Sequence, residues 1–285
     1  MIDFFDTKWH PYFEAWLSED VGAGDHSSLA SILPESQATS QLLLKEDGVI
    51  AGMDLALALF KYVDASVSFK VFVKDGDQLP KGTLLAEAKG SAQSLLKGER
   101  LMLNLMQRLS GIATQTNQIV QKVSGTGLRI LDTRKTTPGL RTLEKWAVTQ
   151  GGGHNHRMGL YDMIMLKDNH IDAAGGINEA ILRTKAYLKA NQLDLKVEVE
   201  TRNLQEVQLA LDHGVDRIMF DNFSPALCRE GVALVNGRAE TEASGGITLE
   251  NIYDYAQTGV MYISVGALTH SVKALDISFK TKLMV

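Results

Sequence analysis

The chain contains 285 residues, of which 45% are hydrophobic and 22% are charged, so it can fill a core of ordinary size and is not a disordered or collagen-like protein. Its 29 Lys and Arg against 34 Asp and Glu give a net charge of −5, which argues against a protein that binds nucleic acid or a lipid surface with its whole surface. Any site for an anion is therefore local, and we expect neither nucleic acid nor membrane as a partner.

The N-terminal residues and the cysteine content favour a cytoplasmic protein. Asp3 and Asp6 stand where a secretory signal peptide carries basic residues. The single cysteine, Cys228, cannot form an intrachain disulfide. The longest nearly apolar stretch, residues 48–60, contains Asp54 and is shorter than the roughly 18 to 20 residues of a membrane-spanning helix.

The first part of the chain combines short strands with one amphipathic helix. Between residues 37 and 87, short alternating runs such as Val67, Phe69 and Val71 predict strands with one apolar face. Leucines then repeat at helical spacing from about residue 98 until Ser110–Gly111 interrupts the pattern. We therefore expect a helix that ends near residue 110 and closes the first part.

The second part alternates apolar strands with helices. The expected strand cores are residues 128–132, 163–166, 195–199, 217–220, 239–243 and 261–265. Helices are expected to start at the capping residues Asn178, Asn203, Ser224 and Thr248 and to end at Gly214, Gly231 and Gly259. Repeated strand–helix units of this size indicate a parallel barrel or a doubly wound sheet.

The predicted strands all end in polar residues, which in a parallel barrel meet at one mouth. Residues 131–170 contain six Lys and Arg against four Asp and Glu, so this segment carries +2 while the rest of the chain carries −7. A cationic pocket in an acidic protein suits a small polyanionic substrate, and arginine adds two-point recognition of carboxylate or phosphate.

Several of these polar residues have more than one interpretation. His154, His156 and His170 could suggest zinc, but no cysteine or carboxylate pattern accompanies them, so we interpret His156 as a donor to an anion. Lys167 ends a predicted strand, and a Schiff-base nucleophile stays an alternative for it. Arg100 lies on a polar helical stripe, which by itself is typical of a solvated face.

Glu200 and Asp221 end adjacent predicted strands. Two carboxylates placed in this way suit sugar hydroxyls or a hydrated Mg²⁺, and the alternative is a salt bridge to lysines opposite. Ser244–Gly246 and Gly266 follow the last two strands, where free amides can hold a phosphate.

A series of motifs resembles those of one known family. They lie at residues 98–100, 103–104, 110–114, 132–139, 151–157, 167–170, 197–200, 221–222, 242–246 and 263–270. The most specific are Asp-Thr-Arg-Lys-Thr-Thr-Pro-Gly, which begins at Asp132, and Asn-His-Arg, which begins at Asn155. In these motifs the chain resembles quinolinate phosphoribosyltransferase, also called nicotinate-nucleotide pyrophosphorylase (carboxylating).

The resemblance implies an α/β fold with two domains. Residues 1–111 would form an N-terminal α/β open sandwich, with the C-terminal tail, residues 272–285, packed back on it. Residues 112–271 would form an incomplete parallel α/β barrel of TIM-like type. The resemblance also implies a homodimer whose subunits share their active sites, and it leaves open whether dimers assemble into hexamers.

The implied reaction joins quinolinate to phosphoribosyl diphosphate and yields nicotinate mononucleotide, diphosphate and CO₂ for NAD synthesis, with Mg²⁺ as cofactor. The resemblance assigns the quinolinate carboxylates to Arg134, His156, Arg157 and Lys167 and to Arg100 of the second subunit. It assigns the phosphoribosyl diphosphate and its Mg²⁺ to Lys135, Glu200 and Asp221, and the 5-phosphate to Ser244, Gly245, Gly246 and Gly266. Thr133 and Ser264 complete the substrate-binding set, and Lys135, Lys167, Glu200 and Asp221 form the catalytic set.

Three other functions remain possible from the sequence. A paralogue associated with molybdenum transport would keep the barrel and bind another substrate, although the intact motifs from Asp132 and Asn155 favour quinolinate. A Schiff-base aldolase would use Lys167. A non-catalytic anion-binding or scaffold protein would bind quinolinate or phosphate without turnover.

Overall fold

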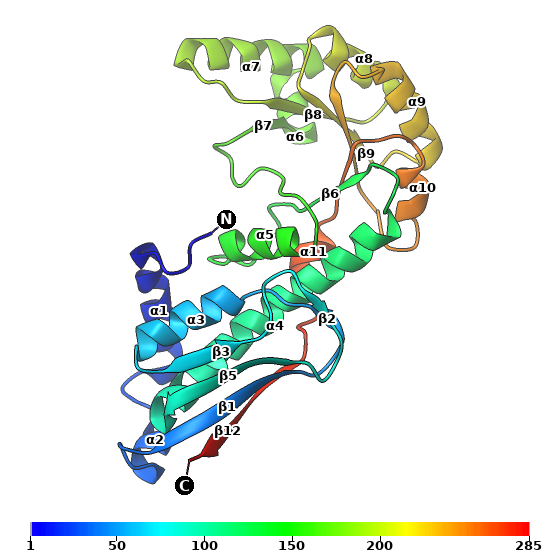
Figure 1. Ribbon diagram of the computed structural model, residues 1–285. Coiled ribbons are helices and arrows are strands. Elements are labelled where there is room, and N and C mark those ends of the chain that lie inside the picture. The colour runs from blue at the N-terminus through cyan, green and yellow to red at the C-terminus, as the bar shows by residue number, and fades with distance from the viewer. Residues whose placement is uncertain (1, 285) are drawn as a thin grey trace. The chain divides into compact units, whose positions relative to one another are not determined.

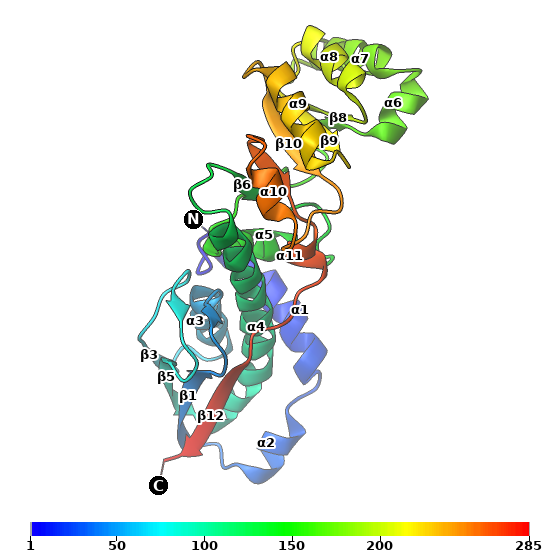
Figure 2. The ribbon, with the colours of Figure 1, turned by 90° about the vertical axis from the view of Figure 1, so that its right-hand side faces the viewer.

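A computed structural model describes residues 2–284, and it divides the chain into two compact units. The first unit comprises the described parts of residues 1–117, 146–152 and 271–285, and the second comprises residues 118–145 and 153–270. Figures 1 and 2 show the elements of each unit. No helix of residues 2–284 is long and apolar enough to cross a bilayer.

The first unit begins with short helices held by side-chain caps. These are the 3₁₀ helix Thr7–Trp9, α1 (His10–Val21) and α2 (His26–Ser31). The side chain of Asp6 accepts a hydrogen bond from the main-chain N–H of Lys8, and Asp25 does the same for Ser28. These carboxylates satisfy N–H groups that have no partner within a helix.

A four-stranded antiparallel sheet forms the rest of this unit. Its strands are β1 (Gln37–Leu44), β3 (Ser68–Val71), β5 (Leu84–Ser91) and β12 (Ile277–Leu283), in the order β12-β1-β5-β3. The short strands β2 (Gly48–Val49) and β4 (Gln78–Leu79) pair separately. The C-terminal residues thus pair with the first strand of the chain.

One face of this sheet is covered by helices and the other is open (Figure 2). On the covered face, the ring of Phe60 from α3 (Met53–Val63) lies 5.1 Å from Phe69 and 6.1 Å from Phe279. The strand that the alternation around Phe69 predicts is therefore confirmed as β3. Val71 departs from that pattern, being 37% exposed, because it ends the edge strand β3.

The predicted end of the helix near residue 110 is wrong. Helix α4 runs without a break from Ala92 to Lys122. The hydroxyl of Ser110 accepts a hydrogen bond from the main-chain N–H of Ala51 and donates one to its carbonyl. A Cβ on Gly111 would collide with the carbonyl oxygen of Lys273. Small residues stand here because other segments approach the helix closely.

The second unit contains a six-stranded sheet in which every neighbouring pair is parallel. The strands are β6 (Arg129–Leu131), β7 (Ile164–Leu166), β8 (Val197–Thr201), β9 (Arg217–Asp221), β10 (Glu240–Ser244) and β11 (Tyr262–Ser264), in the order β6-β11-β10-β9-β8-β7. Within the described residues β6 and β7 are the two edges, so the sheet is an incomplete barrel. The six predicted strand cores and the α/β class are confirmed.

The helices of the second part are α5 (Arg141–Gln150), α6 (Asp168–Ala174), α7 (Ile177–Asn191), α8 (Leu204–Asp212), α9 (Pro225–Val235), α10 (Ile252–Ala256) and α11 (Ala267–His270). The caps at Asn203 and Ser224 are confirmed, since their side chains accept hydrogen bonds from Glu206 and Leu227 main-chain N–H groups.

Three predicted helix boundaries are wrong. Helix α7 begins at Ile177, before Asn178, and α10 begins at Ile252 rather than near Thr248. Gly231 lies within α9, where a Cβ would press on the ring of Phe220 at 2.9 Å. This glycine therefore allows the helix to lie close to the sheet rather than ending the helix.

Candidate active site

A cavity of about 370 Å³ lies at the carboxyl ends of the parallel strands in the second unit. It is lined by Thr133, Arg134, Lys135, His156, Arg157, Met165, Lys167, Glu200, Met219, Asp221, Glu242, Ser244 and Ser264. Most of the predicted site residues therefore share one cavity. Gly245, Gly246 and Gly266 follow the strands just beyond its lining, and Arg100 belongs to α4 in the first unit.

The prediction missed Met165, Met219 and Glu242. Each lies two residues before a polar residue that was recognised at the end of a strand. Side chains two apart on a strand share a face, so Glu242 could have been found from Ser244. The two methionines give the cavity apolar surface beside its charged groups.

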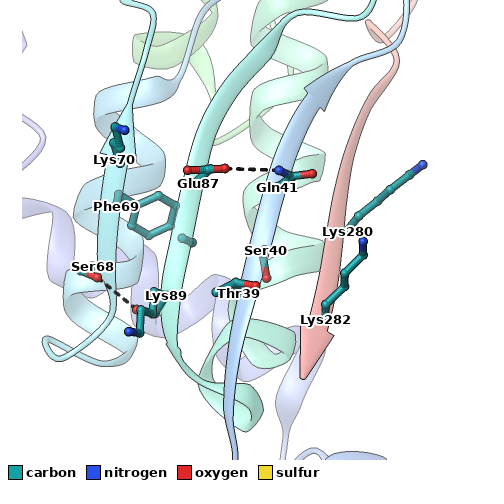
Figure 3. Close-up of a pocket in the computed structure, with 11 residues that line it drawn as sticks. Thr39, Ser40, Gln41, Ser68, Phe69, Lys70, Glu87, Lys89, Lys280 and Lys282 are labelled. Carbon is teal, nitrogen blue, oxygen red and sulfur yellow. Dashed lines mark hydrogen bonds between the residues drawn. The ribbon is translucent and has the colours of Figure 1, made fainter. Parts of the chain in front are cut away.

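A hollow of about 460 Å³ on the open sheet face of the first unit is larger but differs in chemistry. Figure 3 shows Lys280 and Lys282 on one edge strand of this face. Lys70 and Lys89 complete its cationic side chains, and all four lysines are exposed. Alternation of exposed polar and buried apolar residues is the usual state of a one-sided antiparallel sheet, so we place the candidate active site in the barrel.

The buried carboxylate of Asp132 joins the two most specific motifs. Asp132 directly follows β6, Lys145 lies on α5, and the two side chains are fully buried and paired. Asp132 also accepts a hydrogen bond from the main-chain N–H of His156 at 2.8 Å. With its amide oriented to donate, the side-chain nitrogen of Asn155 lies 2.6 Å from the same carboxylate. Burial raises the pKa of Asp132 to about 6, against the opposing effects of Lys145 and the His156 N–H.

His156 lies between two buried carboxylates. Its Nε2 is 3.1 Å from Glu198 Oε2 and 3.4 Å from Glu242 Oε2. Burial acts to lower the pKa of His156, but the two carboxylates outweigh it and raise that pKa to about 9. Its Nδ1 accepts a hydrogen bond from the main-chain N–H of Arg157. In this structure both ring nitrogens therefore contact protein groups.

Two arginines converge on the cavity. Burial and the nearby positive charge of Arg134 lower the pKa of Arg157. One guanidinium nitrogen of Arg157 donates to the carbonyl of Met163 at 3.0 Å. The Nε of Arg134 is buried and has no hydrogen-bond partner among the described residues. Two cations held together, one with an unsatisfied buried donor, form a site for an anion.

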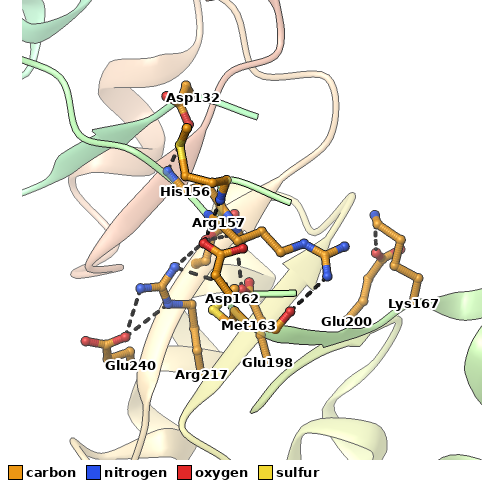
Figure 4. A network of polar contacts seen from close by, with 12 residues as sticks. Asp132, His156, Arg157, Asp162, Met163, Lys167, Glu198, Glu200, Arg217 and Glu240 are labelled. Atoms are coloured by element: carbon orange, nitrogen blue, oxygen red, sulfur yellow. Dashed lines mark hydrogen bonds and ion pairs between the residues drawn. The ribbon is translucent and has the colours of Figure 1, made fainter. Parts of the chain in front are cut away.

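Lys167 and Glu200 form an ion pair across the cavity. The Nζ of Lys167 is 2.9 Å from Glu200 Oε2, with the lysine side chain 46% exposed and the glutamate side chain 9% exposed (Figure 4). The salt bridge that was the alternative to metal binding therefore exists for Glu200. Asp221 ends the adjacent strand and accepts a hydrogen bond from the Asn222 amide.

The carboxylates of Glu200 and Asp221 fit a divalent cation in chemistry. Both line the cavity from adjacent strands, and both supply the oxygen ligands that Mg²⁺ prefers. In this structure the singly charged ammonium group of Lys167 contacts the Glu200 carboxylate. Glu200 and Asp221 are therefore the residues that would hold Mg²⁺.

The turn after β10 requires glycine for its shape. Gly245 and Gly246 have positive φ values of 97° and 61°, and a Cβ on Gly245 would collide with the side chain of Asn222. After the neighbouring strand, a Cβ on Gly266 would meet Lys135 and His270 at about 3.2 Å. The backbone therefore approaches the cavity edge closely at both strand ends, as a phosphate site requires.

Comparisons with known proteins show the family of the chain. Residues 25–110 match the family profile "Quinolinate phosphoribosyl transferase, N-terminal domain", and residues 112–280 match "Quinolinate phosphoribosyl transferase, C-terminal domain". A relative from Nicotiana tabacum, quinolinate phosphoribosyltransferase [decarboxylating] 2b, mitochondrial, is 48% identical over 280 residues, which cover 93% of this chain and 79% of that protein.

A bacterial relative and a solved crystal structure support the same family. The probable nicotinate-nucleotide pyrophosphorylase [carboxylating] of Bacillus subtilis (strain 168) is 48% identical over 265 residues and covers 93% of this chain and 90% of its own length. The crystal structure of NadC from Streptococcus pyogenes superimposes with a TM-score of 0.93 at 41% identity, covering 98% of both chains. The chain therefore belongs to the quinolinate phosphoribosyltransferase family.

Proposed function

We propose that this protein transfers the phosphoribosyl group of phosphoribosyl diphosphate to the nitrogen of quinolinate, releasing diphosphate and CO₂ and giving nicotinate mononucleotide for NAD synthesis. The observation that carries the proposal is the convergence of Arg134 and Arg157 on a cavity that also holds Lys135 and Lys167. Relatives that share nearly half of this sequence carry names that describe the same decarboxylating transfer.

The first chemical step needs positioning more than a nucleophilic side chain. The pyridine nitrogen attacks ribose C1, the bond from C1 to the diphosphate breaks, and positive charge develops on the ribose. Arg134, Arg157 and Lys167 hold the two carboxylates of quinolinate, so the nitrogen is presented to C1 as a bound neighbour. Lys135 compensates negative charge on the departing diphosphate.

The second step uses the charge that the first creates. Once the ring nitrogen is quaternary and positive, the electron pair left at C2 when CO₂ departs is stabilised beside it. The C2 carbon then takes up one proton, which gives nicotinate mononucleotide. The protein's part is to hold the 3-carboxylate and to limit access of water to the ring.

Mg²⁺ completes the proposed site. When bound, it neutralises charge on the diphosphate oxygens. Glu200 and Asp221 would hold it, directly or through water. Ser244, Ser264 and the glycines Gly245, Gly246 and Gly266 would accommodate the 5-phosphate, with Thr133 beside them. The close backbone approach at these glycines supports that assignment.

We further infer a homodimer in which Arg100 of one subunit serves the cavity of the other, and a cytoplasmic location. The dimer rests on the family resemblance of the Gly98–Arg100 motif. The location rests on the single cysteine, which cannot form an intrachain disulfide. Some plant relatives carry "mitochondrial" or "chloroplastic" in their names.

Product analysis tests the function directly. The protein is incubated with quinolinate, phosphoribosyl diphosphate and Mg²⁺, and nicotinate replaces quinolinate in a parallel reaction. We expect nicotinate mononucleotide and CO₂ from quinolinate, and no product from nicotinate, which lacks the second carboxylate. A folded protein that binds quinolinate or phosphate but forms no product would support the scaffold alternative instead.

A further inference from the structure

A cluster of charged side chains lies buried beneath the cavity. Glu198 from β8, Arg217 from β9 and Glu242 from β10 form it, and the two carboxylates are fully buried. Arg217 lies 3.2 Å from Glu242 and 3.9 Å from Glu198. Burying two carboxylates under a site for anions is costly unless partners compensate them. Arg217 also pairs with Glu240 at 2.9 Å, so its single positive charge is shared among three carboxylates and leaves the two buried ones incompletely compensated.

His156 is the second group that compensates the negative charge of Glu198 and Glu242. Among the described residues, neither oxygen of Glu198 accepts a conventional hydrogen bond, and Nε2 of His156 at 3.1 Å is a donor within reach. Glu242 receives Arg217 on Oε2 and faces the same Nε2 at 3.4 Å. The imidazole therefore presents Nε2 to the pair of carboxylates.

The contact of the other ring nitrogen argues against a metal ion at this cluster. Atoms of His156, Glu198 and Glu242 lie within 4.8 Å of one another, as the ligands of a cation would. A histidine that binds a metal through one nitrogen normally donates the proton on the other. Here Nδ1 instead accepts the N–H of Arg157 at 2.7 Å. The ring proton is therefore on Nε2, where it points at the carboxylates.

Two influences act on a second proton of the His156 ring, which would be bound at Nδ1. The carboxylates favour it, whereas the N–H of Arg157 opposes it, because a proton on Nδ1 would face that N–H directly. At 2.7 Å two N–H groups cannot face each other. Nε2 keeps its proton under both influences, and the two carboxylates outweigh burial and raise the pKa of the ring to about 9.

Arg157 depends on this arrangement. Its main-chain N–H is bound by Nδ1 of His156, and its guanidinium is bound by the carbonyl of Met163. The main-chain N–H of His156 is held in turn by Asp132. A rotation of the imidazole would release the N–H of Arg157 and leave that residue fixed only through its side chain.

We propose that Glu242 and Glu198 are positioning residues of the quinolinate site, which fix the imidazole of His156 and through it the direction of Arg157. The proposal rests on the function proposed above, because it assigns Arg157 to a carboxylate of quinolinate. Glu242 and Glu198 carry the same sign of charge as the substrates, so we assign their role to the contact with His156.

A matched pair of variants tests the proposal. Glu240 lies on the same strand as Glu242 and binds the same Arg217 at 2.9 Å, but it does not contact His156. Glu242→Gln and Glu240→Gln thus remove the same charge beside the same arginine. We expect Glu242→Gln to raise the KM for quinolinate on the order of ten-fold, the effect typical of residues that orient a binding group. The KM for phosphoribosyl diphosphate should change less than two-fold, as should both values in Glu240→Gln.

A spectroscopic measurement on the unaltered protein removes any dependence on how the variants fold. Ring ¹⁵N resonances of His156, identified by their loss in His156→Asn, report which nitrogen carries the proton. We expect a protonated Nε2 near neutral pH, and a change of this signature in Glu242→Gln but not in Glu240→Gln.

The outcomes separate the two proposals. An active protein whose Glu242→Gln and Glu240→Gln variants have the same KM for quinolinate would overturn the positioning role, and so would an Nε2 that carries no proton. An unaltered protein that forms no nicotinate mononucleotide would overturn the proposed function, and the quinolinate assignment of Arg157 with it.

Discussion

At the scale of single residues, the environment of each charge decides what it can do. Arg134 and Arg157 lie close enough for the charge of one to lower the pKa of the other, and Arg134 keeps an unsatisfied buried Nε. Such an arrangement is unfavourable until an anion arrives, and binding energy is then gained from both cations. Asp132, by contrast, is fully engaged in the interior and supports the motif instead of facing the cavity.

Replacement of Arg134 by alanine tests the anion site. The change removes a charge-assisted, two-point contact from a partly dehydrated cavity, so we expect kcat/KM for quinolinate to fall by about 10² or more. The control is Arg183→Ala on the exposed surface of α7, which should leave kcat/KM unchanged. Steady-state kinetics measure both, and near-normal turnover of Arg134→Ala would exclude Arg134 from substrate binding.

The single cysteine should be unreactive in the folded protein. Cys228 is fully buried in α9, and burial raises the pKa of its thiol to about 12. At pH 8 only about 10⁻⁴ of the thiol is ionised, and the thiolate is the reactive form. We expect an aromatic disulfide reagent to label the native protein very slowly and to titrate one thiol at once in guanidinium chloride. Rapid labelling without denaturant would contradict the buried position.

At the scale of elements, close packing overrides local signals. Ser110–Gly111 reads as a helix break in the sequence, yet α4 continues because these two small residues let Ala51 and Lys273 approach its backbone. Gly231 in α9 likewise lets the ring of Phe220 pack against the helix backbone. In both helices a glycine marks a contact rather than an end.

Gly111→Ala tests this interpretation of α4. In an exposed helix, alanine would be more stable than glycine by roughly 0.5 to 1 kcal/mol. Here the added methyl group meets the carbonyl of Lys273, so we expect a net loss of about 1 to 3 kcal/mol. Gln118→Ala, at an exposed position of the same helix, is the control and should be neutral or slightly stabilising. Denaturant midpoints measure both, and a stable Gly111→Ala protein would disprove the close contact.

At the scale of the whole molecule, the proposed function requires a residue from each of two units. Arg100 lies on α4 in the first unit, and Lys167 lies beside the cavity of the second. The family resemblance assigns Arg100 to the cavity of a second subunit. If so, each active site of a dimer is built from two chains, and inactive variants can complement one another.

A mixing experiment tests the shared site. Arg100→Ala and Lys167→Ala should each be inactive alone. A hybrid dimer contains one site in which both residues are intact, so random reassortment of an equal mixture should restore about a quarter of the normal activity. In the control, Arg100→Ala is mixed with the double variant, which leaves every site defective. No recovery despite demonstrated subunit exchange would refute shared sites.

The sequence by itself determined the six parallel strands and the polar residues at their carboxyl ends. These features depend on local periodicity, and parallel strands of one sheet present their carboxyl ends at the same edge. The caps at Asn203 and Ser224 were predictable for the same reason, because a cap acts within three residues.

Only the tertiary structure decided what surrounds those residues. The sequence placed His156 beside Arg157, but nothing local indicated that Glu198 and Glu242 would meet its ring, or that Asp132 would bind its main chain. The continuation of α4 past Gly111 likewise depends on residues near the other end of the chain. Periodicity tells which way a side chain faces, whereas packing between distant segments decides which partner it finds there.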